Sequence, residues 1–195
     1  DVCAASATES TTALQSLRDL GGLEKDSDVL ILGTGGGVGS AGIVIAKALG
    51  ANVTAVCSNR DAERVKELGG NRVLNSSEKI EGKYDIVFDK PAKYSRTKIL
   101  KNLKKGGAYV TTLPSFGFLW AYLATVFSSK KVALIECKSV KRDLEFIAQL
   151  LGKDLEMIPI DSVHKIKDLD KAIQRQLEQS SKKNGRVVVD VGNGW

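Results

Sequence analysis

The stretch Asp28–Gly39 reads Asp-Val-Leu-Ile-Leu-Gly-Thr-Gly-Gly-Gly-Val-Gly, and it decides the fold of this chain. Its first half is a run of strand-forming apolar residues, glycine fills four of the five positions Gly33–Gly37, and an amphipathic pattern follows over Ile43–Leu49. Because glycine has no Cβ atom, backbone N–H groups can approach a phosphate, and the positive end of the helix dipole faces it. The stretch therefore predicts a strand, a tight turn and a helix that bind a dinucleotide.

The glycines admit more than one register of the dinucleotide-binding pattern G-x-G-x-x-G. Counted from Gly33, the sixth residue is Val38 and the pattern fails; counted from Gly37, it fits but begins after the strand has ended. Counted from Thr34, Gly36 takes the position that approaches phosphate and Gly39 the position of helix–strand packing. A glycine-rich turn in another kind of α/β protein is the alternative, because the pattern alone is weak. The expected cradle consists of Thr34, Gly35, Gly36, Gly37, Val38 and Gly39.

Strand and helix patterns alternate with short connections after an opening helix expected over Thr8–Leu20. This alternation predicts an α/β fold, a doubly wound parallel sheet (Rossmann fold), and we place this dinucleotide-binding domain at residues 8–152. The expected strands are Val29–Leu32, Asn52–Cys57, Arg72–Asn75, Tyr84–Phe88, Ala108–Leu113 and Val132–Glu136, and the helices are Val38–Leu49, Ala62–Leu68, Ser95–Leu103 and Lys141–Leu151.

After Gly152 the rhythm changes, and residues 153–195 predict a C-terminal strand–helix–strand appendage. Its strands are expected near Met157–Ile160 and over Val187–Val191, on either side of a helix over Asp168–Gln179. Glycines that follow helical patterns commonly cap helix C-termini. We expect such caps at Gly50, Gly69-Gly70 and Gly106-Gly107.

Composition and charge exclude several classes of protein. The 195 residues are 43% hydrophobic and 27% charged, as in ordinary globular domains, and no apolar run reaches the ~20 residues of a membrane span. The net charge of +6 comes from scattered lysines without interleaved aromatic residues, so we expect no nucleic-acid partner. Three cysteines and one histidine lie far apart, which predicts no metal site and an intracellular, reducing compartment. Cytoplasm and organelle (mitochondrion or plastid) both stay open, as do a homo-oligomer and peripheral contact with a membrane.

The end of the second expected strand lies where this fold places the adenosine ribose. An Asp or Glu there selects NAD through the 2′-hydroxyl, but this strand is followed by Ser58, Asn59 and Arg60. A hydroxyl, an amide and a guanidinium suit a 2′-phosphate, which Arg60 can pair with two hydrogen bonds. The sequence therefore predicts NADPH as the cofactor, with a merely solvated Arg60 as the alternative. We expect Asp61 to be the N-cap of the next helix rather than a ribose ligand.

Short motifs spread over nearly the whole chain are more specific than the glycine turn alone. They are Thr11–Leu17, Gly36–Gly39, Ala46–Ala51, Val53–Ser58, Tyr84–Asp89, Gly106–Thr111 and Asn184–Val189. In this order they resemble the quinone oxidoreductase branch of the medium-chain dehydrogenases/reductases. The resemblance implies a reductase that transfers a hydride from NADPH to a quinone or an α,β-unsaturated carbonyl. It also implies that Leu113, Pro114 and Ser115 flank the nicotinamide, and it assigns no catalytic residue.

The chain departs from the family pattern in three places. Family members begin with a GroES-like substrate domain, of which only a return segment after Gly152 has a counterpart here. Lys90-Pro91-Ala92 stands where the family has a small turn beside the cofactor. Zinc-dependent relatives carry a metal-binding cysteine where Ala4–Thr11 holds neither Cys nor His, so the resemblance implies a zinc-free protein. The first two departures favour the alternative of a nucleotide-binding or interaction module without catalysis.

Two other patterns are interpreted as unrelated to function. Tyr94 and Lys98 spell the Tyr-x-x-x-Lys pair of short-chain dehydrogenases, but they lie too close in sequence to the glycine turn, on an expected surface helix. An S-adenosylmethionine methyltransferase also has a glycine turn after its first strand. It needs an acidic residue at the tip of the second strand, and Ser58 and Asn59 argue against it.

Overall fold

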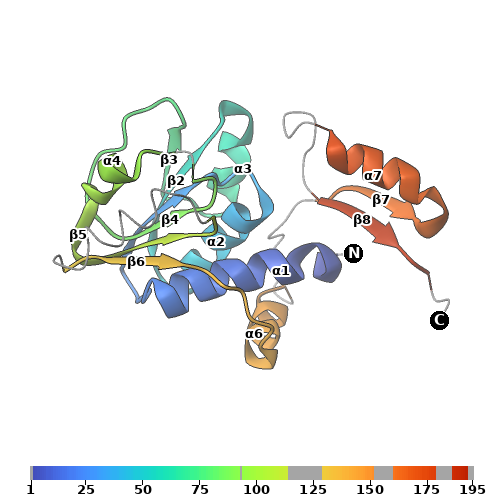
Figure 1. Ribbon diagram of the computed structural model, residues 1–195, viewed down its shortest axis with the longest axis horizontal. Coiled ribbons are helices and arrows are strands. Elements are labelled where there is room, and N and C mark those ends of the chain that lie inside the picture. Colours follow the sequence, from blue (N-terminus) through green and yellow to red (C-terminus); the bar gives the residue numbers. More distant parts are fainter. Residues whose placement is uncertain (1, 93, 114–128, 152–159, 179–185, 193–195) are drawn as a thin grey trace.

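The computed structural model describes residues 2–92, 94–113, 129–151, 160–178 and 186–192. Its main feature is a parallel sheet built from β1 (Asp28–Leu32), β2 (Asn52–Cys57), β3 (Arg72–Asn75), β4 (Tyr84–Asp89), β5 (Leu103–Thr111) and β6 (Lys131–Leu134). The strand order is β3-β2-β1-β4-β5-β6 (Figure 1). This order, with its reversal between β1 and β4, defines the Rossmann fold. The predicted doubly wound sheet is therefore confirmed.

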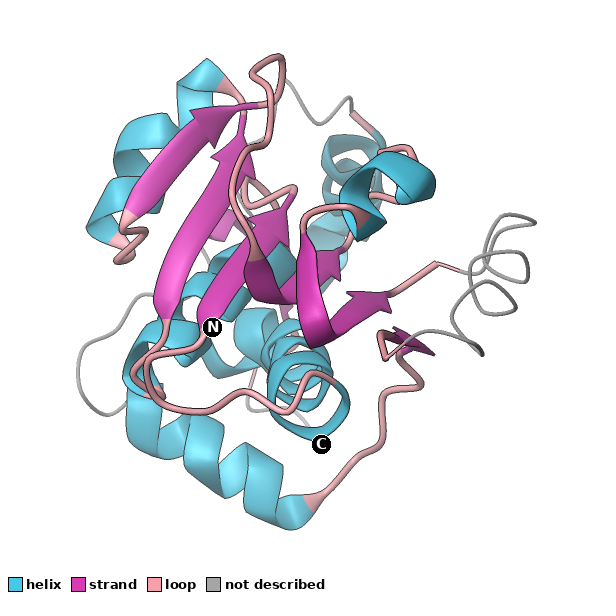
Figure 2. Ribbon diagram, turned by 90° about the vertical axis from the view of Figure 1, so that its left-hand side faces the viewer, coloured by secondary structure: helices cyan, strands magenta, loops and turns pink. Residues whose placement is uncertain are grey.

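Helices cover both faces of the sheet (Figure 2), which explains the continuous apolar run of the first strand. Val29 and Ile31 pack into one hydrophobic cluster, Leu30 and Leu32 pack into the other, and none of the four is exposed to solvent. The first cluster includes side chains of α1 (Val2–Leu14), α2 (Gly37–Ala48), α3 (Ala62–Glu67) and α6 (Lys141–Leu151), and the second includes α4 (Arg96–Leu100). Because β1 is held on both sides, the glycine turn that follows it has a fixed position.

The first helix and the glycines at residues 106 and 107 differ from the sequence-based expectation. The opening helix begins at Val2 and its last turns, Gln15–Leu20, are π-helical. Gly50 and Gly69 follow α2 and α3 with positive φ angles of 83° and 103°, as the caps were predicted. The expected cap at Gly106-Gly107 is wrong, because α4 already ends at Leu100 and both glycines lie within β5. There Gly106 has φ +81°, and the pairing register of β4 with β5 shifts between Tyr84 and Ile86.

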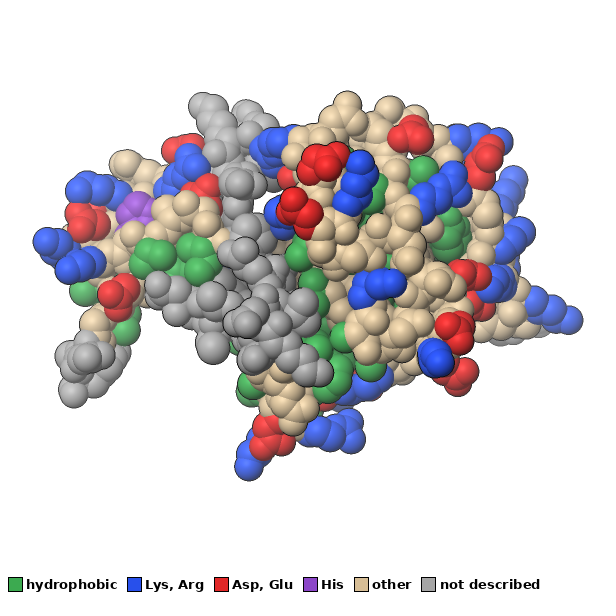
Figure 3. Space-filling model, turned by 180° about the vertical axis from the view of Figure 1, so that it is seen from behind, with side chains coloured by type: hydrophobic (Ala, Val, Ile, Leu, Met, Phe, Trp, Pro, Cys, Tyr) green, Lys and Arg blue, Asp and Glu red, His purple; other side chains and the backbone are tan. Residues whose placement is uncertain are grey.

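The C-terminal strand–helix–strand appendage is also present. It consists of β7 (Ile160–Lys165), α7 (Leu169–Leu177) and β8 (Arg186–Asp190), in which β7 and β8 pair as a separate two-stranded parallel sheet. Arg186 of β8 forms an ion pair of 2.8 Å with Glu9 of α1, and the unit lies near the N-terminal end of α1 (Figure 1). Apolar side chains remain exposed on this unit (Figure 3), including Ile173 and Leu177 of α7. The expected boundary at residue 152 and the strand start at Met157 lie outside the described residues.

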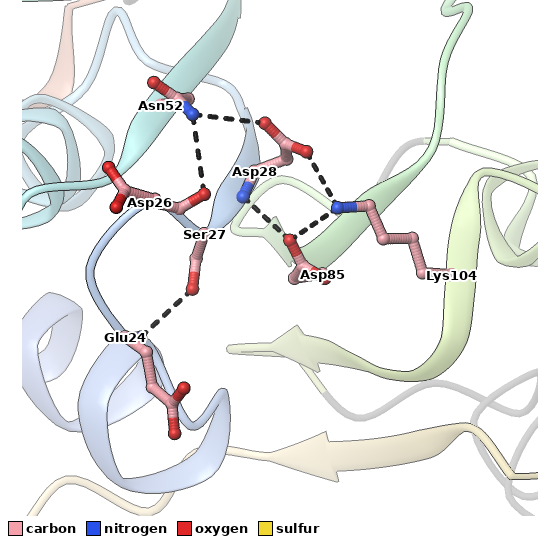
Figure 4. Close-up of polar contacts among 7 residues, drawn as sticks. All are labelled: Glu24, Asp26, Ser27, Asp28, Asn52, Asp85 and Lys104. Atoms are coloured by element: carbon pink, nitrogen blue, oxygen red, sulfur yellow. Dashed lines mark hydrogen bonds and ion pairs between the residues drawn. The ribbon is translucent and has the colours of Figure 1, made fainter.

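At the N-terminal edge of the large sheet, a lysine joins three strands (Figure 4). The Lys104 ammonium of β5 donates hydrogen bonds to Asp28 Oδ2 of β1 (2.7 Å) and to Asp85 Oδ2 of β4 (2.8 Å). The backbone N–H of Asp28 also donates to Asp85 Oδ2 at 2.8 Å. These hydrogen bonds join the N-terminal ends of the strands, at the end of the sheet opposite the glycine turn.

Among the described residues, no helix has the length and apolar character of a membrane span.

Candidate functional site

A cleft of about 830 Å³ opens at the C-terminal ends of the strands, beside the point where the strand order reverses. In open α/β sheets this is the region where ligands bind. Residues from the ends of β1, β2, β3 and β4 and from the loops that follow these strands form its wall. They are Gly33, Gly35, Gly36, Val56, Cys57, Ser58, Arg60, Asp61, Ser76, Lys90, Pro91 and Tyr94.

The glycines of the turn have sharply different surroundings. A Cβ atom placed on Gly36 would meet no other atom within 4 Å, so the cleft is open above this residue. A Cβ atom on Gly39 would lie 2.5 Å from the carbonyl oxygen of Gly33, so α2 packs closely on the turn that directly follows β1. Gly36 is the N-cap of α2, and the first N–H groups of a helix lack partners within the helix. Open space at Gly36 and crowding at Gly39 support the register counted from Thr34.

The turn is fastened to its neighbours by Thr34 and by two polar side chains that the sequence analysis did not single out, Ser40 and Arg64. Thr34 is buried, and its hydroxyl and its backbone N–H both donate to the carbonyl oxygen of Val56. Arg64 of α3 donates from Nη2 to the Gly35 carbonyl oxygen and from Nη1 to Ser40 Oγ, each at 3.0 Å. Ser40 in turn donates to the Thr34 carbonyl oxygen at 3.1 Å. Arg64 therefore fixes the turn through the carbonyl oxygen of Gly35 and, by way of Ser40, that of Thr34.

The residues after β2 differ in what they face. Ser58 and Arg60 line the cleft, whereas the Asn59 side-chain oxygen accepts a hydrogen bond from the Asn75 amide at the end of β3. Asp61 occupies the predicted N-cap position of α3, although its side chain makes no capping hydrogen bond. Its carboxylate is buried at the cleft and accepts a hydrogen bond of 2.6 Å from the Ser58 hydroxyl. The sequence placed Asp61 on a helix end, and folding turns its side chain back toward β1.

The loop after β4 forms the opposite wall of the cleft and is built on a buried carboxylate. Asp89 is fully buried, and its carboxylate accepts hydrogen bonds from the Tyr109 hydroxyl at 2.7 Å and from the Ala92 backbone N–H at 2.9 Å. This bond holds Ala92 at φ +49°, a rare angle for a residue with a side chain. The ring of Pro91 lies against Gly33, because a Cβ atom on that glycine would be 2.8 Å from Pro91 Cδ. The loop is thus a braced wall in place of the small turn that the family resemblance implies.

Burial raises the pKa of two titratable side chains of the cleft, Cys57 and Tyr94. Burial raises the pKa of the Cys57 thiol above its ordinary value, against the smaller effect of its hydrogen bond with Thr34. Burial also raises the pKa of the Tyr94 hydroxyl, and the negative charge of Asp89 adds to this shift. Tyr94 precedes α4 and lines the cleft, so the expectation that it lies on a surface helix is wrong. The charged groups in the wall are Arg60, Lys90 and Asp61, which give a local excess of positive charge.

The remaining predicted site residues lie elsewhere or outside the described ranges. Leu113 follows β5, is half exposed and is not part of the cleft wall. Pro114 and Ser115 lie outside the described residues. Within the described ranges, no group of three or more His, Cys, Asp or Glu side chains is arranged to hold a metal ion. The arrangement that the structure does describe can bind an anionic group at the N-terminus of α2 and a second one near Arg60.

Fold and cleft together place the chain in the Rossmann class of α/β proteins, and comparison with known proteins narrows this class. Residues 37–136 match the sequence model of the zinc-binding dehydrogenase family. The chain is 27% identical over 195 residues to the chloroplast envelope quinone oxidoreductase homolog of Arabidopsis thaliana, covering 92% of this chain and 58% of the relative. It is 36% identical over 118 residues to a mitochondrial NAD(P)H oxidoreductase of Mus musculus, covering 54% and 30% of the two chains.

Among solved structures, the quinone oxidoreductase from Coxiella burnetii superposes with a TM-score of 0.80 at 23% identity, over 95% of this chain and 59% of that one. This similarity supports the fold. The chain belongs to the zinc-binding dehydrogenase family and, within the medium-chain dehydrogenases/reductases, to the quinone-oxidoreductase-like branch. It spans 58% or less of the length of the two curated relatives named above.

Proposed function

We propose that this chain binds NADPH in the cleft and serves a zinc-independent reductase that transfers a hydride to quinones or α,β-unsaturated carbonyls. The observation that carries the proposal is the open glycine turn at the start of α2, with Arg60 and Lys90 in the same cleft wall. The relatives named above support it, since their names describe a quinone oxidoreductase homolog and an NAD(P)H oxidoreductase. A small organic molecule is the proposed partner, in a reducing intracellular compartment.

The cleft has the chemistry that a dinucleotide diphosphate requires. The space above Gly36 admits a phosphate, and the N–H groups of Gly37 and Val38 begin a helix of twelve residues whose dipole favours negative charge. Thr34 and Gly35 shape this turn, and Gly39 allows the close packing of α2 on β1. At the other end, Ser58 and Arg60 line the wall where the 2′-phosphate of the adenosine ribose is proposed to bind, with Asn59 beside them.

When bound, the cofactor supplies the hydride, and the protein supplies position and electrostatics. The braced turn and the Pro91 wall restrict the orientation of a ligand between β1 and β4. Leu113, Pro114 and Ser115 are proposed to flank the nicotinamide at the end of β5. We assign no general acid among the described residues.

The alternative function is a nucleotide-binding or interaction module of the same fold that does not catalyse hydride transfer. The loop at Lys90 and Pro91 favours this alternative, because a proline ring packs against Gly33 where the family pattern has a small turn. A bulky wall at this position restricts the approach of a second ligand to the bound cofactor. The two functions therefore share the cofactor cleft and differ in turnover.

Fluorescence titration with NADPH and NADH tests cofactor binding. We expect NADPH to bind several-fold more tightly, and Arg60→Ala to reduce the difference by about 1–2 kcal/mol, the scale of a hydrogen bond to a charged group. Arg72→Ala is the matched control, because Arg72 is exposed at the start of β3. Equal affinities of the unaltered protein for both cofactors would contradict the NADPH preference.

Gly36→Val separates binding from folding. The valine side chain meets no protein atom near its Cβ position, so we expect an unchanged melting temperature and a loss of binding of both cofactors. A folded variant with unaltered affinity would place the cofactor elsewhere. Oxidation of NADPH with a benzoquinone, a naphthoquinone and an enone, followed by absorbance, then distinguishes the two functions. Binding of NADPH without reduction of any acceptor favours the module, and reduction that Gly36→Val abolishes favours the enzyme.

A further inference from the structure

Asp61 is the one carboxylate in the described wall of the cleft, and its placement is unexpected. It ends the 3₁₀ turn Asn59–Asp61 that follows β2, and only 7% of the residue is exposed. An aspartate at a helix start normally accepts hydrogen bonds from the free N–H groups of its own helix. Asp61 makes no such bond, and its carboxylate lies instead between Ser58 and Gly35 of the glycine turn. Because the buried Asp61 carboxylate does not cap α3, this side chain is available for another role in the cleft.

The carboxylate lies directly beside the glycine turn. A Cβ atom on Gly35 would collide with Asp61 Oδ2, so this oxygen occupies the space next to the backbone of that glycine. Arg64 fixes the same glycine from the other side through its carbonyl oxygen. In this fold the adenosine ribose lies between the glycine turn and the tip of the second strand. Asp61 therefore reaches, from a position several residues after the strand, the region that a ribose 2′-substituent enters.

Asp61 also determines what Ser58 can do. A serine hydroxyl carries a single proton, and that of Ser58 is donated to Asp61 Oδ2 at 2.6 Å. While this bond holds, Ser58 has no proton to donate to a phosphate oxygen and can only accept a hydrogen bond. Ser58, which the sequence analysis assigned to the 2′-phosphate, is therefore better suited to accept a hydrogen bond from a 2′-hydroxyl.

The arginines around Asp61 neutralise it only in part. Arg60 Nε lies 3.6 Å and Arg64 Nη2 3.9 Å from Asp61 Oδ1, which are longer than hydrogen-bonded ion pairs. Arg60 has almost half of its side chain exposed, and Arg64 is also bound to Gly35 and Ser40. A 2′-phosphate that approaches Arg60 therefore also approaches a carboxylate with a retained negative charge.

We propose that Asp61 is a specificity-determining residue that opposes Arg60: it favours the 2′-hydroxyl of NADH and weakens binding of the 2′-phosphate of NADPH. The inference rests on the proposed cofactor site. The preference for NADPH is then moderate in the unaltered protein, because Arg60 attracts the 2′-phosphate and the Asp61 carboxylate repels it. Removal of the charge at residue 61 makes the cleft strongly selective for NADPH.

The test is the ratio of the dissociation constants of NADH and NADPH, measured by fluorescence titration. We expect Asp61→Asn to raise this ratio at least about tenfold, the scale of one charge-assisted hydrogen bond. Glu63→Gln is the matched control, because it removes the same charge two residues later from a side chain that is 82% exposed, and it should leave the ratio unchanged. A parallel change in both constants for Asp61→Asn would overturn the inference.

Ser58→Ala gives a second, opposite result and decides the question if Asp61→Asn does not fold. Without the serine proton, the Asp61 carboxylate is available to the 2′-hydroxyl, and the ratio should fall. A rise or no change of the ratio in this variant would overturn the inference. Failure of both cofactors to bind the unaltered protein would instead overturn the proposed function, so the two failures are distinguishable.

Discussion

The large sheet and the β7–α7–β8 unit differ in how far their apolar side chains are exposed to solvent. Leu30 in β1 has no exposed surface, whereas Leu177 in α7 is 79% exposed and Ile173 is 51% exposed. The six strands of the large sheet lie between two hydrophobic clusters, while β7 and β8 form a sheet of two strands that packs against α7. A two-stranded sheet alone is marginally stable.

This difference indicates that different interactions stabilise the two units. The large sheet rests on apolar burial, which contributes roughly 25 cal/mol for each Å² removed from water. In the C-terminal unit, Arg175 of α7 binds the side chain of Asp161 in β7 with two hydrogen bonds of 2.7 and 2.8 Å. The Asp161 side chain is only 3% exposed, so this pair joins the helix to a buried carboxylate of the strand. The following predictions separate these contributions.

The largest expected effect comes from the same substitution in each unit. Leu30→Ala should lower the free energy of unfolding by about 2–5 kcal/mol, because it leaves a cavity between fully buried neighbours. Leu177→Ala should change it by less than about 0.5 kcal/mol, because most of that side chain is already in water. Urea denaturation measures both values. Similar losses for the two variants would show that α7 is covered in solution.

Arg175→Met should act on one unit alone. Loss of the guanidinium leaves the buried Asp161 carboxylate without this partner, so amides of β7 and β8 should exchange with deuterium much faster. Amides of β1 and β4 should keep their protection. Lys171→Met is the control, because Lys171 lies in the same helix and its ion pair with Asp168 is at the surface. Equal acceleration in both sheets would mean that the two units unfold together.

The smallest expected effect concerns the ion pairs of the large sheet (Figure 4). Burial raises the pKa of Asp85, but its hydrogen bonds with Lys104 and the Asp28 N–H outweigh burial and hold it below its ordinary value of 3.8. Its contribution is therefore complete above pH 3.8 and is lost as the pH falls through the lowered pKa. Hydrogen bonds to Asp28 and Asp85 raise the pKa of Lys104, so the lysine contribution is lost only above its ordinary value of 10.5.

Lys104→Met should accordingly cost at most about 1 kcal/mol at pH 7, because the three side chains are over a third exposed and solvent screens them. The difference from the unaltered protein should shrink on acidification below pH 3.8. Thermal unfolding between pH 2 and 8 measures it, with Lys66→Met as the control for an exposed pair. A constant difference over this range would contradict the assignment to Asp85.

Local pattern was enough for the elements that position the candidate site. The run before Gly33 predicted β1, the strands over Asn52–Cys57 and Arg72–Asn75 were predicted with their observed bounds, and helix α6 over Lys141–Leu151 likewise. These elements follow from periodicity and β-propensity within a few neighbouring residues. Glycine at residue 39 is required by a contact within the turn itself, because a Cβ atom there would collide with the backbone of Gly33 and Thr34.

Contacts between distant residues decided the rest. Arg64 reaches Gly35, and Asp89 holds Tyr109, across more than a dozen intervening residues in each case. Asp61 and Tyr94 carry local signals of a helix end and a surface helix, yet both line the cleft because the strands bring their loops together. Gly106-Gly107 resembles a helix cap but lies within β5, at the point where the pairing register with β4 shifts. The sequence by itself determined the turn, the family and most of the strands, with β5 beginning earlier than expected. Only the tertiary structure decided which charges face the cleft, because a side chain's direction depends on partners that no local pattern contains.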